Sequence, residues 1–286
     1  KGFIVRESHD GYTHWNGYMS LDDFLKKNDI IGLLGIDTRA LVRKIRETGT
    51  MKGVIVSEDI SKDEAFKIIH NTELNNYVES VTTKTAYDLW PLDKPIAKVA
   101  VIDFGIKRNI IRALLKRNLQ LKIFPATTSF EVIKAYAPDG IFMSNGPGDP
   151  KEIPGVIEEV GKIIESKIPT FGICLGHQLI CLALGGETIP LKYGHRGGNH
   201  PVKDIQMNKI VITAQNHGYV VTDESIKDLP VEITHTNLND QTIEGIKHLN
   251  KPLFSVQYHP EASPGPDDSE YLFDQFVDLI FKNMKE

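Results

Sequence analysis

The sequence predicts an α/β protein, with a larger C-terminal domain on a mostly parallel sheet flanked by helices and a smaller α/β domain before it. With 286 residues, the chain exceeds the roughly 150 residues of an average domain. From residue 98 onwards, short continuous apolar runs alternate with amphipathic segments, as in βαβ units around a buried parallel sheet. Residues 81–97 lack any period and contain Pro91 and Pro95. We therefore expect a small domain at residues 1–80, a linker at 81–97 and the larger domain at 98–286.

The first 80 residues contain signals for three helices and two strands. Helix starts are indicated where a capping side chain precedes an amphipathic segment, at Ser20, Asp37 and Ser61. Apolar runs predict strands at Gly2–Val5 and Gly53–Val56. The chain starts with Lys1 directly at the first of these strands, so we expect this domain to be partial.

The larger domain shows the alternation of strands and helices most clearly. Strands are predicted at Lys98–Asp103, Leu121–Phe124, Gly140–Met143, Ile168–Ile173 and Leu253–Tyr258. Helices are predicted at Lys107–Lys116 and Gln178–Leu184. The first helix carries several basic residues, namely Lys107, Arg108, Arg112, Lys116 and Arg117. We interpret them as a solvated helix face, because the chain is acidic and no aromatic residues alternate with them.

Composition argues against several classes of protein. The net charge of -5 disfavours a general affinity for nucleic acid or anionic membranes. No apolar run approaches the roughly 20 residues of a membrane span. The two cysteines, Cys174 and Cys181, are seven residues apart in one predicted segment, too far to form a disulfide with each other. Free thiols fit a reducing compartment, so we expect a cytoplasmic protein.

Cys174 has the surroundings of a catalytic nucleophile. A predicted strand ends just before it, glycines flank it at Gly172 and Gly176, and a predicted helix follows. This strand–turn–helix context is that of a nucleophile elbow, with cysteine in place of serine. The start of a helix also favours the thiolate. Cys181 lies in a wholly apolar run, where a small buried hydrophobic residue is the better interpretation.

A cysteine nucleophile needs a base, and the base needs an orienting partner. His259 and Glu261 follow the predicted strand that ends at Tyr258. Residues i and i+2 of an extended segment point the same way, and Pro260 disfavours helix at the histidine. Glu261 can then hold one ring nitrogen of His259 while the other faces Cys174. Other histidines, such as His195, His200 and His217, lack a carboxylate at comparable spacing.

The segment Ser144–Pro150 (SNGPGDP) follows another predicted strand. Its dipeptides Asn-Gly and Pro-Gly indicate a turn. At the carboxyl edge of a parallel sheet, such a turn can also line a ligand site, with backbone N–H groups that reach an oxyanion.

These motifs resemble a known family. Gly172–Gln178 together with His259–Glu261 resembles the class I (triad) glutamine amidotransferases. Further stretches are similar to the small, glutamine-hydrolysing subunit of carbamoyl phosphate synthetase: Ile36–Arg39, Ser144–Pro150, Gly194–Val202, Gln215–Gly218 and His259–Pro266. They extend over both expected domains.

The resemblance implies a catalytic triad of Cys174, His259 and Glu261. It implies glutamine contacts at Gly146, Gly148, Leu175, Gln178, Asn216, Gly218 and Tyr219. Two of these also follow from position: Gln178 lies one helical turn beyond Cys174, and the Leu175 N–H is the usual oxyanion donor. Family members carry a further N-terminal serine that contacts glutamine, which has no counterpart in this sequence.

The implied function is hydrolysis of L-glutamine to glutamate and ammonia, without metal or cofactor in this chain. A large subunit would use the ammonia, with bicarbonate, ATP and magnesium, to make carbamoyl phosphate for arginine or pyrimidine biosynthesis. Three alternatives remain open at this point. The chain could serve another synthetase, of the anthranilate or guanylate type. It could hydrolyse other γ-glutamyl substrates, or be an inactive, truncated scaffold.

Overall fold

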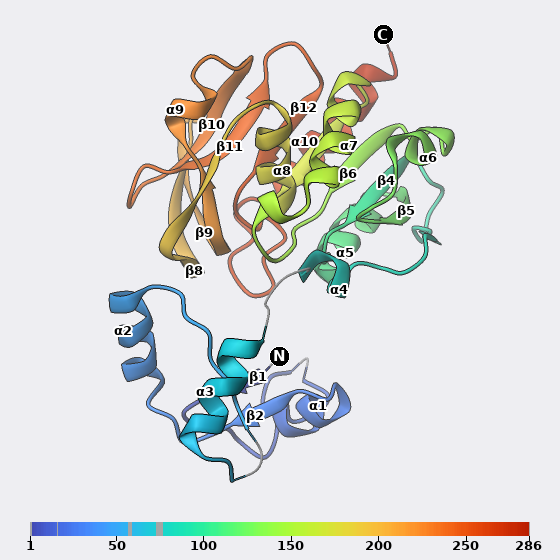
Figure 1. Ribbon diagram of the computed structural model, residues 1–286. Coiled ribbons are helices and arrows are strands. Elements are labelled where there is room, and N and C mark those ends of the chain that lie inside the picture. Colours follow the sequence, from blue (N-terminus) through green and yellow to red (C-terminus); the bar gives the residue numbers. More distant parts are fainter. Residues whose placement is uncertain (1, 16, 57–58, 73–76, 286) are drawn as a thin grey trace. The chain divides into compact units, whose positions relative to one another are not determined.

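The computed structural model describes residues 2–15, 17–56, 59–72 and 77–285 (Figure 1). It divides the chain into two compact units, Lys1–Leu74 and Asn75–Glu286. The division falls before residue 80, where we expected the domain boundary. The reason is the short helix α4 (Tyr77–Val81), whose Val78 is buried in the apolar core of the larger unit.

The smaller unit is an α/β unit with a two-stranded parallel sheet. Its elements are β1 (Gly2–Ile4), α1 (Leu21–Lys27), β2 (Ile31–Leu33), α2 (Thr38–Thr48) and α3 (Lys62–Asn71). All three predicted caps are confirmed, and the side chains of Ser20, Asp37 and Ser61 each accept a backbone N–H of the helix that follows. Lys1 lies outside the described residues.

The strand predicted at Gly53–Val56 is wrong. That segment is irregular, and the exposed fractions of Val54 and Val56 are 36% and 43%. An apolar run becomes a strand only where a neighbouring strand offers hydrogen bonds. Strand β1 pairs with β2 and not with Gly53–Val56. Strand β2 was not among the predicted strands.

The larger unit is built on a ten-stranded sheet. Its strands are β3 (Tyr87–Leu89), β4 (Ala97–Asp103), β5 (Leu119–Pro125), β6 (Gly140–Met143), β7 (Thr170–Ile173), β8 (Thr188–Asp204), β9 (Lys209–Val221), β10 (Val231–Asn237), β11 (Ile243–His248) and β12 (Leu253–Val256). Their order is β3-β5-β4-β6-β7-β12-β11-β10-β8-β9. The stretch β5-β4-β6-β7-β12 is parallel, and the other neighbours pair antiparallel. The predicted α/β class is confirmed for this unit, whose sheet is mixed with a parallel centre of five strands.

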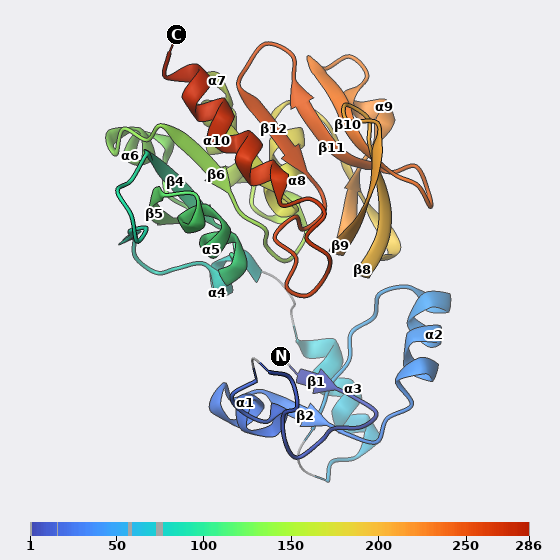
Figure 2. The same ribbon diagram turned by 180° about the vertical axis from the view of Figure 1, so that it is seen from behind.

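Helices cover both faces of this sheet. They are α5 (Arg108–Lys116), α6 (Phe130–Ala135), α7 (Pro154–Glu165), α8 (Leu175–Ala183), α9 (Asp223–Ile226) and α10 (Tyr271–Asn283), with a 3-10 turn at Pro150–Glu152. Figures 1 and 2 show α7 and α8 on one face and α5 and α10 on the other. Strand β4 supplies both layers, because Val99 and Val101 join the core under α5 and α10 while Ala100 and Ile102 join the opposite core.

Part of the segment expected as a linker belongs to the sheet. Strand β3 pairs antiparallel with β5, and its Leu89 packs against the core under α5. Like β2, it is too short to show periodicity. Among the described helices, none combines the length and apolar character that a membrane crossing demands.

Candidate active site

Cys174 lies at the junction between β7 and α8. Strand β7 ends at Ile173, helix α8 begins at Leu175, and Cys174 between them has φ 53° and ψ −101°. A positive φ is unfavourable for a residue with a Cβ atom and persists only where neighbouring contacts enforce it. One such contact is the Cys174 N–H, which donates to the carbonyl of Val256 on β12 at 2.8 Å. The thiol is thus presented at the carboxyl edge of the parallel strands.

The glycine at position 176 allows the first turn of α8 to pack directly on β6. Its N–H donates to the carbonyl of Ser144 at 3.1 Å. A Cβ atom on Gly176 would lie 2.5 Å from the carbonyl oxygen of Met143. Further along α8, Cys181 is fully buried, and burial raises the pKa of its thiol well above the usual range. Cys181 is therefore the small buried hydrophobic residue that the apolar run predicted.

His259 and Glu261 come together beside Cys174. The imidazole Nδ1 of His259 lies 2.7 Å from Glu261 Oε1. The backbone N–H of His259 donates to the carbonyl of Ala214 at 2.9 Å. Burial alone would lower the pKa of His259, but interaction with Cys174 and Glu261 outweighs it and raises this pKa to about 10. The imidazole is therefore favoured in its protonated form.

The backbone around this pair differs from the expected extended segment. Strand β12 ends at Val256, His259 forms an isolated bridge with Ala214, and Pro260 and Glu261 are in a turn. The turn still brings the carboxylate onto Nδ1. The meeting of the two side chains was predicted correctly, although the extended geometry assumed for it was wrong.

Lys107 completes the charged cluster behind His259. Its Nζ lies 2.9 Å from Glu261 Oε1 and donates to the carbonyl of Ala262 at 2.6 Å. Burial would raise the pKa of Glu261, but His259 and Lys107 together hold it below its usual value. Our interpretation of Lys107 as part of a solvated face was wrong. Helical periodicity describes one element only, and the partner of this lysine lies far along the chain.

A cavity of about 720 Å³ opens above the thiol. Cys174 and His259 line it, together with six of the residues predicted to contact glutamine: Gly146, Gly148, Gln178, Asn216, Gly218 and Tyr219. Gly148 has φ 93°, in the left-handed region that only glycine enters easily. Leu175 is buried and does not line the cavity. As the first residue of α8, however, it has a backbone N–H with no acceptor inside the helix.

Gln178 is engaged more tightly than the sequence suggested. Its Nε2 donates to the carbonyl of Tyr219 and to Oε1 of Gln257, both at 3.0 Å. Since both N–H groups are used within the protein, only the Oε1 atom of Gln178 can accept from a ligand. The residue thus both supports the cavity wall and offers an acceptor.

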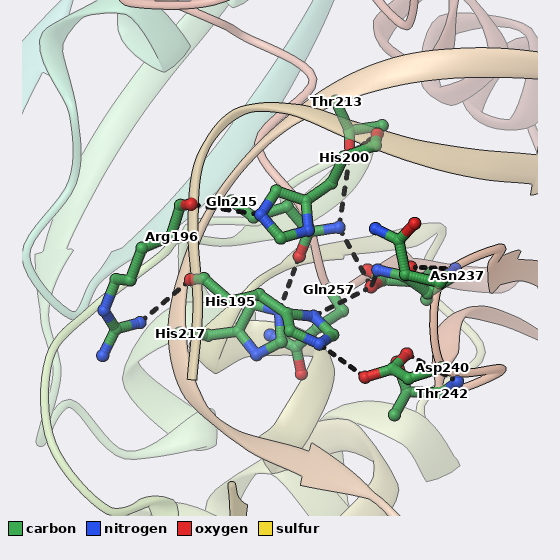
Figure 3. A network of polar contacts seen from close by, with 12 residues as sticks. His195, Arg196, His200, Thr213, Gln215, His217, Asn237, Asp240, Thr242 and Gln257 are labelled. Carbon is green, nitrogen blue, oxygen red and sulfur yellow. Dashed lines mark hydrogen bonds and ion pairs between the residues drawn. The ribbon is translucent and has the colours of Figure 1, made fainter. Parts of the chain in front are cut away.

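A chain of polar contacts lies beside the cavity (Figure 3). His195 Nε2 lies 2.8 Å from Asp240 Oδ2, and its Nδ1 lies 3.4 Å from Glu244 Oε1. The Gln215 amide donates to Glu244 at 2.9 Å, and Gln215 Oε1 lies 2.6 Å from His217 Nε2. Sequence patterns did not indicate this network, because its carboxylates, in strand β11 and in the turn before it, are distant in sequence from the histidines.

The donor atoms of His195, His217 and Glu244 lie within 4.8 Å of one another, as metal ligands can. Two buried atoms of this group, His195 Nδ1 and Glu244 Oε2, have no hydrogen-bond partner among the described residues. Both nitrogens of His217 face oxygens of Tyr219 and Gln215. Burial would lower the pKa of His195, but its two carboxylates raise it overall. The imidazole of His195 thus lies between the carboxylates of Asp240 and Glu244.

Comparisons with known proteins identify the family of the chain. Residues 100–279 match the glutamine amidotransferase class-I family, and residues 1–55 match the carbamoyl-phosphate synthase small chain, CPSase domain. A solved structure from Thermoplasma acidophilum, described as a putative GMP synthase component, shares the fold. Its TM-score is 0.58, with 22% identity over 66% of this chain and 96% of its own.

Curated relatives cover nearly the whole chain. The carbamoyl phosphate synthase small chain of Clostridium acetobutylicum is 50% identical over 98% of this chain and 79% of its own length. That of Bacillus caldolyticus is 49% identical over 98% and 76%. The pyrimidine-specific small chain of Bacillus subtilis is 46% identical over 100% and 77%. The chain therefore belongs to the family of carbamoyl phosphate synthase small chains.

Proposed function

We propose that this chain hydrolyses L-glutamine to glutamate and ammonia with a triad of Cys174, His259 and Glu261. We further propose that it supplies the ammonia to a large subunit that makes carbamoyl phosphate. One observation carries the proposal. The strained Cys174 lies at an open cavity beside the imidazole of His259, whose pKa is raised and whose Nδ1 is held by a buried carboxylate.

The first half of the reaction forms a thioester. The Cys174 thiolate attacks the side-chain carboxamide carbon of glutamine, and the carbonyl oxygen becomes an oxyanion. In this proposal, the N–H of Leu175 and a backbone N–H at Gly148 stabilise it, each worth about 3 kcal/mol. Protonated His259 then gives its proton to the departing nitrogen, so that ammonia leaves and a glutamyl thioester remains.

The second half regenerates the thiol. Neutral His259 takes a proton from water, and the resulting hydroxide attacks the thioester carbon. Glutamate leaves, and the thiolate–imidazolium pair is restored. Glu261 keeps Nδ1 protonated throughout, so the other ring nitrogen is the one that exchanges protons with the substrate.

Ammonia is useful only to a second enzyme that consumes it. The relatives are named small chains of carbamoyl phosphate synthase, which supports a partnership with a large chain. We propose that this partner binds ATP and magnesium and combines ammonia with bicarbonate. The product would enter arginine or pyrimidine biosynthesis, and the pyrimidine-specific relative favours the latter.

Glutaminase turnover with and without an added large subunit tests the proposal. We expect the wild type to release glutamate from glutamine and Cys174→Ser to lose at least about a thousandfold in kcat. Cys181→Ser is the matched control and should retain turnover, since Cys181 does not line the cavity. An electrophilic glutamine analogue that labels Cys181, or neither cysteine, would contradict the triad.

A further inference from the structure

Three buried side chains of metal-ligating types meet on strands β8, β9 and β11, and none of them belongs to the triad. They are His195, His217 and Glu244, which together form the His–Glu cluster. Their ligand atoms all lie within 4.8 Å of one another. Imidazole nitrogens and carboxylate oxygens are common ligands of zinc in proteins. The chemical types and the spacing are therefore those of a possible metal site.

The sheet holds the two imidazoles of the cluster side by side. In the ladder between β8 and β9, His195 pairs directly with His217. Their ring centroids are 4.8 Å apart, and Figure 3 shows the two rings next to each other. Residues directly opposite each other on antiparallel strands have Cβ atoms about 4.5–5.5 Å apart and point to the same face. Two ligands are thus brought together by backbone pairing alone.

Each imidazole uses one ring nitrogen for a contact outside the cluster. His195 Nε2 lies 2.8 Å from Asp240 Oδ2, and His217 Nδ1 lies 2.8 Å from the carbonyl oxygen of Tyr219. An oxygen acceptor holds the proton on that nitrogen, so the other nitrogen is left to face a metal. Metal-ligating histidines almost always have a carboxylate, a backbone carbonyl or a water in this outer position. Both histidines of the cluster meet that condition.

Two buried atoms of the cluster lack a hydrogen-bond partner among the described residues, namely His195 Nδ1 and Glu244 Oε2. His195 Nδ1 lies 3.4 Å from Glu244 Oε1. Two ligands that lie about 2.0–2.1 Å from a tetrahedral metal are roughly 3.4 Å apart. This separation is long for a hydrogen bond and suits a cation shared by the two side chains.

His217 also has a contact that a cation would improve. Burial lowers the pKa of His217 to about 3, so its imidazole is neutral and carries one N–H. Its two nitrogens face the carbonyl of Tyr219 at 2.8 Å and Oε1 of Gln215 at 2.6 Å. One proton can serve only one of these oxygens. With the proton on Nδ1, a metal at Nε2 would take the place of the Gln215 amide and remove the conflict.

The cluster is also short of positive charge. Within the described part of the chain, the only ion pair of Glu244 is with His195, which is shared with Asp240. Burial would lower the pKa of His195, but the two carboxylates raise it overall. One imidazolium can balance only one of the two carboxylates. A divalent cation would displace the proton from Nδ1 and balance both.

We propose that His195, His217 and Glu244 bind a divalent transition-metal ion, and that two nitrogens and one carboxylate favour zinc. The ion would connect β8, β9 and β11, and Asp240 would orient His195 from outside. This site goes beyond the proposed hydrolysis of glutamine, which uses no side chain of the cluster. The two proposals can therefore fail independently.

Zinc binding is best measured in a Cys174→Ser parent, so that the thiol cannot act as a ligand. After EDTA treatment of the protein, competition with a chromophoric zinc chelator gives the stoichiometry and the Kd. We expect one Zn²⁺ per chain. Asp240→Asn should weaken binding about 10- to 100-fold, as the loss of an outer contact does, and His195→Gln and Glu244→Gln should weaken it further. Because Asp240 is exposed, its variant also keeps the test valid if a variant of a buried ligand fails to fold.

His248→Gln is the matched control for the loss of a buried imidazole. His248 is on β11, the strand of Glu244, and is not one of the three clustered ligands. Its Kd for zinc should equal that of the Cys174→Ser parent. Equal weakening in His248→Gln and His195→Gln would overturn the proposal, because zinc would then bind histidines without selecting the cluster.

Cobalt(II) reports the type of ligand directly. Bound to the Cys174→Ser parent, Co²⁺ should give the visible absorption of a tetrahedral nitrogen and oxygen site, and His195→Gln should lose it. Two further results would overturn the proposal. The parent could bind no zinc, or zinc could bind only while Cys174 is present, which would make the thiol its ligand. No turnover is measured in these assays, so a failure of the proposed glutaminase function would leave their outcome unchanged.

Discussion

Replacing Gly176 by alanine tests whether the packing of the elbow positions the thiol. The added Cβ would lie 2.5 Å from the carbonyl oxygen of Met143, and its other nearest atoms belong to the same residue. These include backbone atoms of β6, which cannot rotate out of the way as a side chain can. The first turn of α8 must therefore move away from β6 by roughly 1 Å to restore an ordinary contact. The hydrogen bond from Gly176 to Ser144 lengthens with it.

Two effects should follow. Overpacking of this kind costs about 1–3 kcal/mol, which lowers the melting temperature of a unit of this size by about 2–12 °C. Since Cys174 immediately precedes α8, the thiol and the Leu175 N–H move relative to His259. A misplacement of about 1 Å can cost about a hundredfold in rate, so we expect kcat for glutamine to fall by that order.

Thermal unfolding and steady-state glutaminase turnover measure the two effects. Gly161→Ala is the matched control, because Gly161 lies inside α7 and a Cβ there meets nothing within 4 Å. Alanine in a helix interior is better than glycine by roughly 0.5–1 kcal/mol, so this variant should melt slightly higher with unchanged turnover. Wild-type kcat and melting temperature in Gly176→Ala would refute the reasoning.

Three further predictions concern the charged groups and thiols. Lys107→Met removes one of the two cations that contact buried Glu261. Denaturant unfolding should therefore show a free energy of unfolding that is lower by about 1–3 kcal/mol than in the wild type. Equal free energies of unfolding would contradict this pairing. At pH 8, a neutral alkylating reagent should label Cys174 and spare Cys181, whose buried thiol has a raised pKa. Peptide mass spectrometry identifies the labelled cysteine. Rapid labelling of Cys181 in the native protein would contradict the burial of its thiol. The folded-state pKa of His259 is raised, so its stabilising effect is complete below about pH 6.5 and is lost as pH rises towards 10. The difference in melting temperature between the wild type and His259→Gln should therefore shrink from pH 6 to pH 10, and a difference that grows would oppose this sign.

The parts of the molecule that could be predicted from sequence are those whose signal is local. The caps at Ser20, Asp37 and Ser61 act within one helical turn, and each was found where expected. The parallel strands were visible because buried strands are continuously apolar. The elbow at Cys174 could be predicted because strand, turn and helix pack closely there. This packing leaves no room for side chains larger than hydrogen at Gly172 and Gly176, and the two glycines mark the turn in the sequence.

The parts that could not be predicted depend on pairing between distant segments. Lys107 meets Glu261, and His195 meets Glu244, only after the sheet has brought their segments together. A helical or strand period reports which face of an element is apolar, not what lies opposite a charged residue. The strand β3 was missed for a related reason, since three residues become a strand only through their partner β5.

The hydrogen bond from Cys174 to Val256 also bears on when the proposed nucleophile is supported by the fold. Strand β12 lies beside β7 in the sheet, yet the chain between them first runs through α8 and four further strands. While the chain is being synthesised, Cys174 leaves the ribosome long before Val256 and His259 exist to support it. The thiol then lacks both the carbonyl that holds its backbone and the imidazole that activates it. Under the proposed mechanism, the incomplete chain thus carries an ordinary cysteine, and the nucleophile is assembled only when the last strand of the sheet is in place.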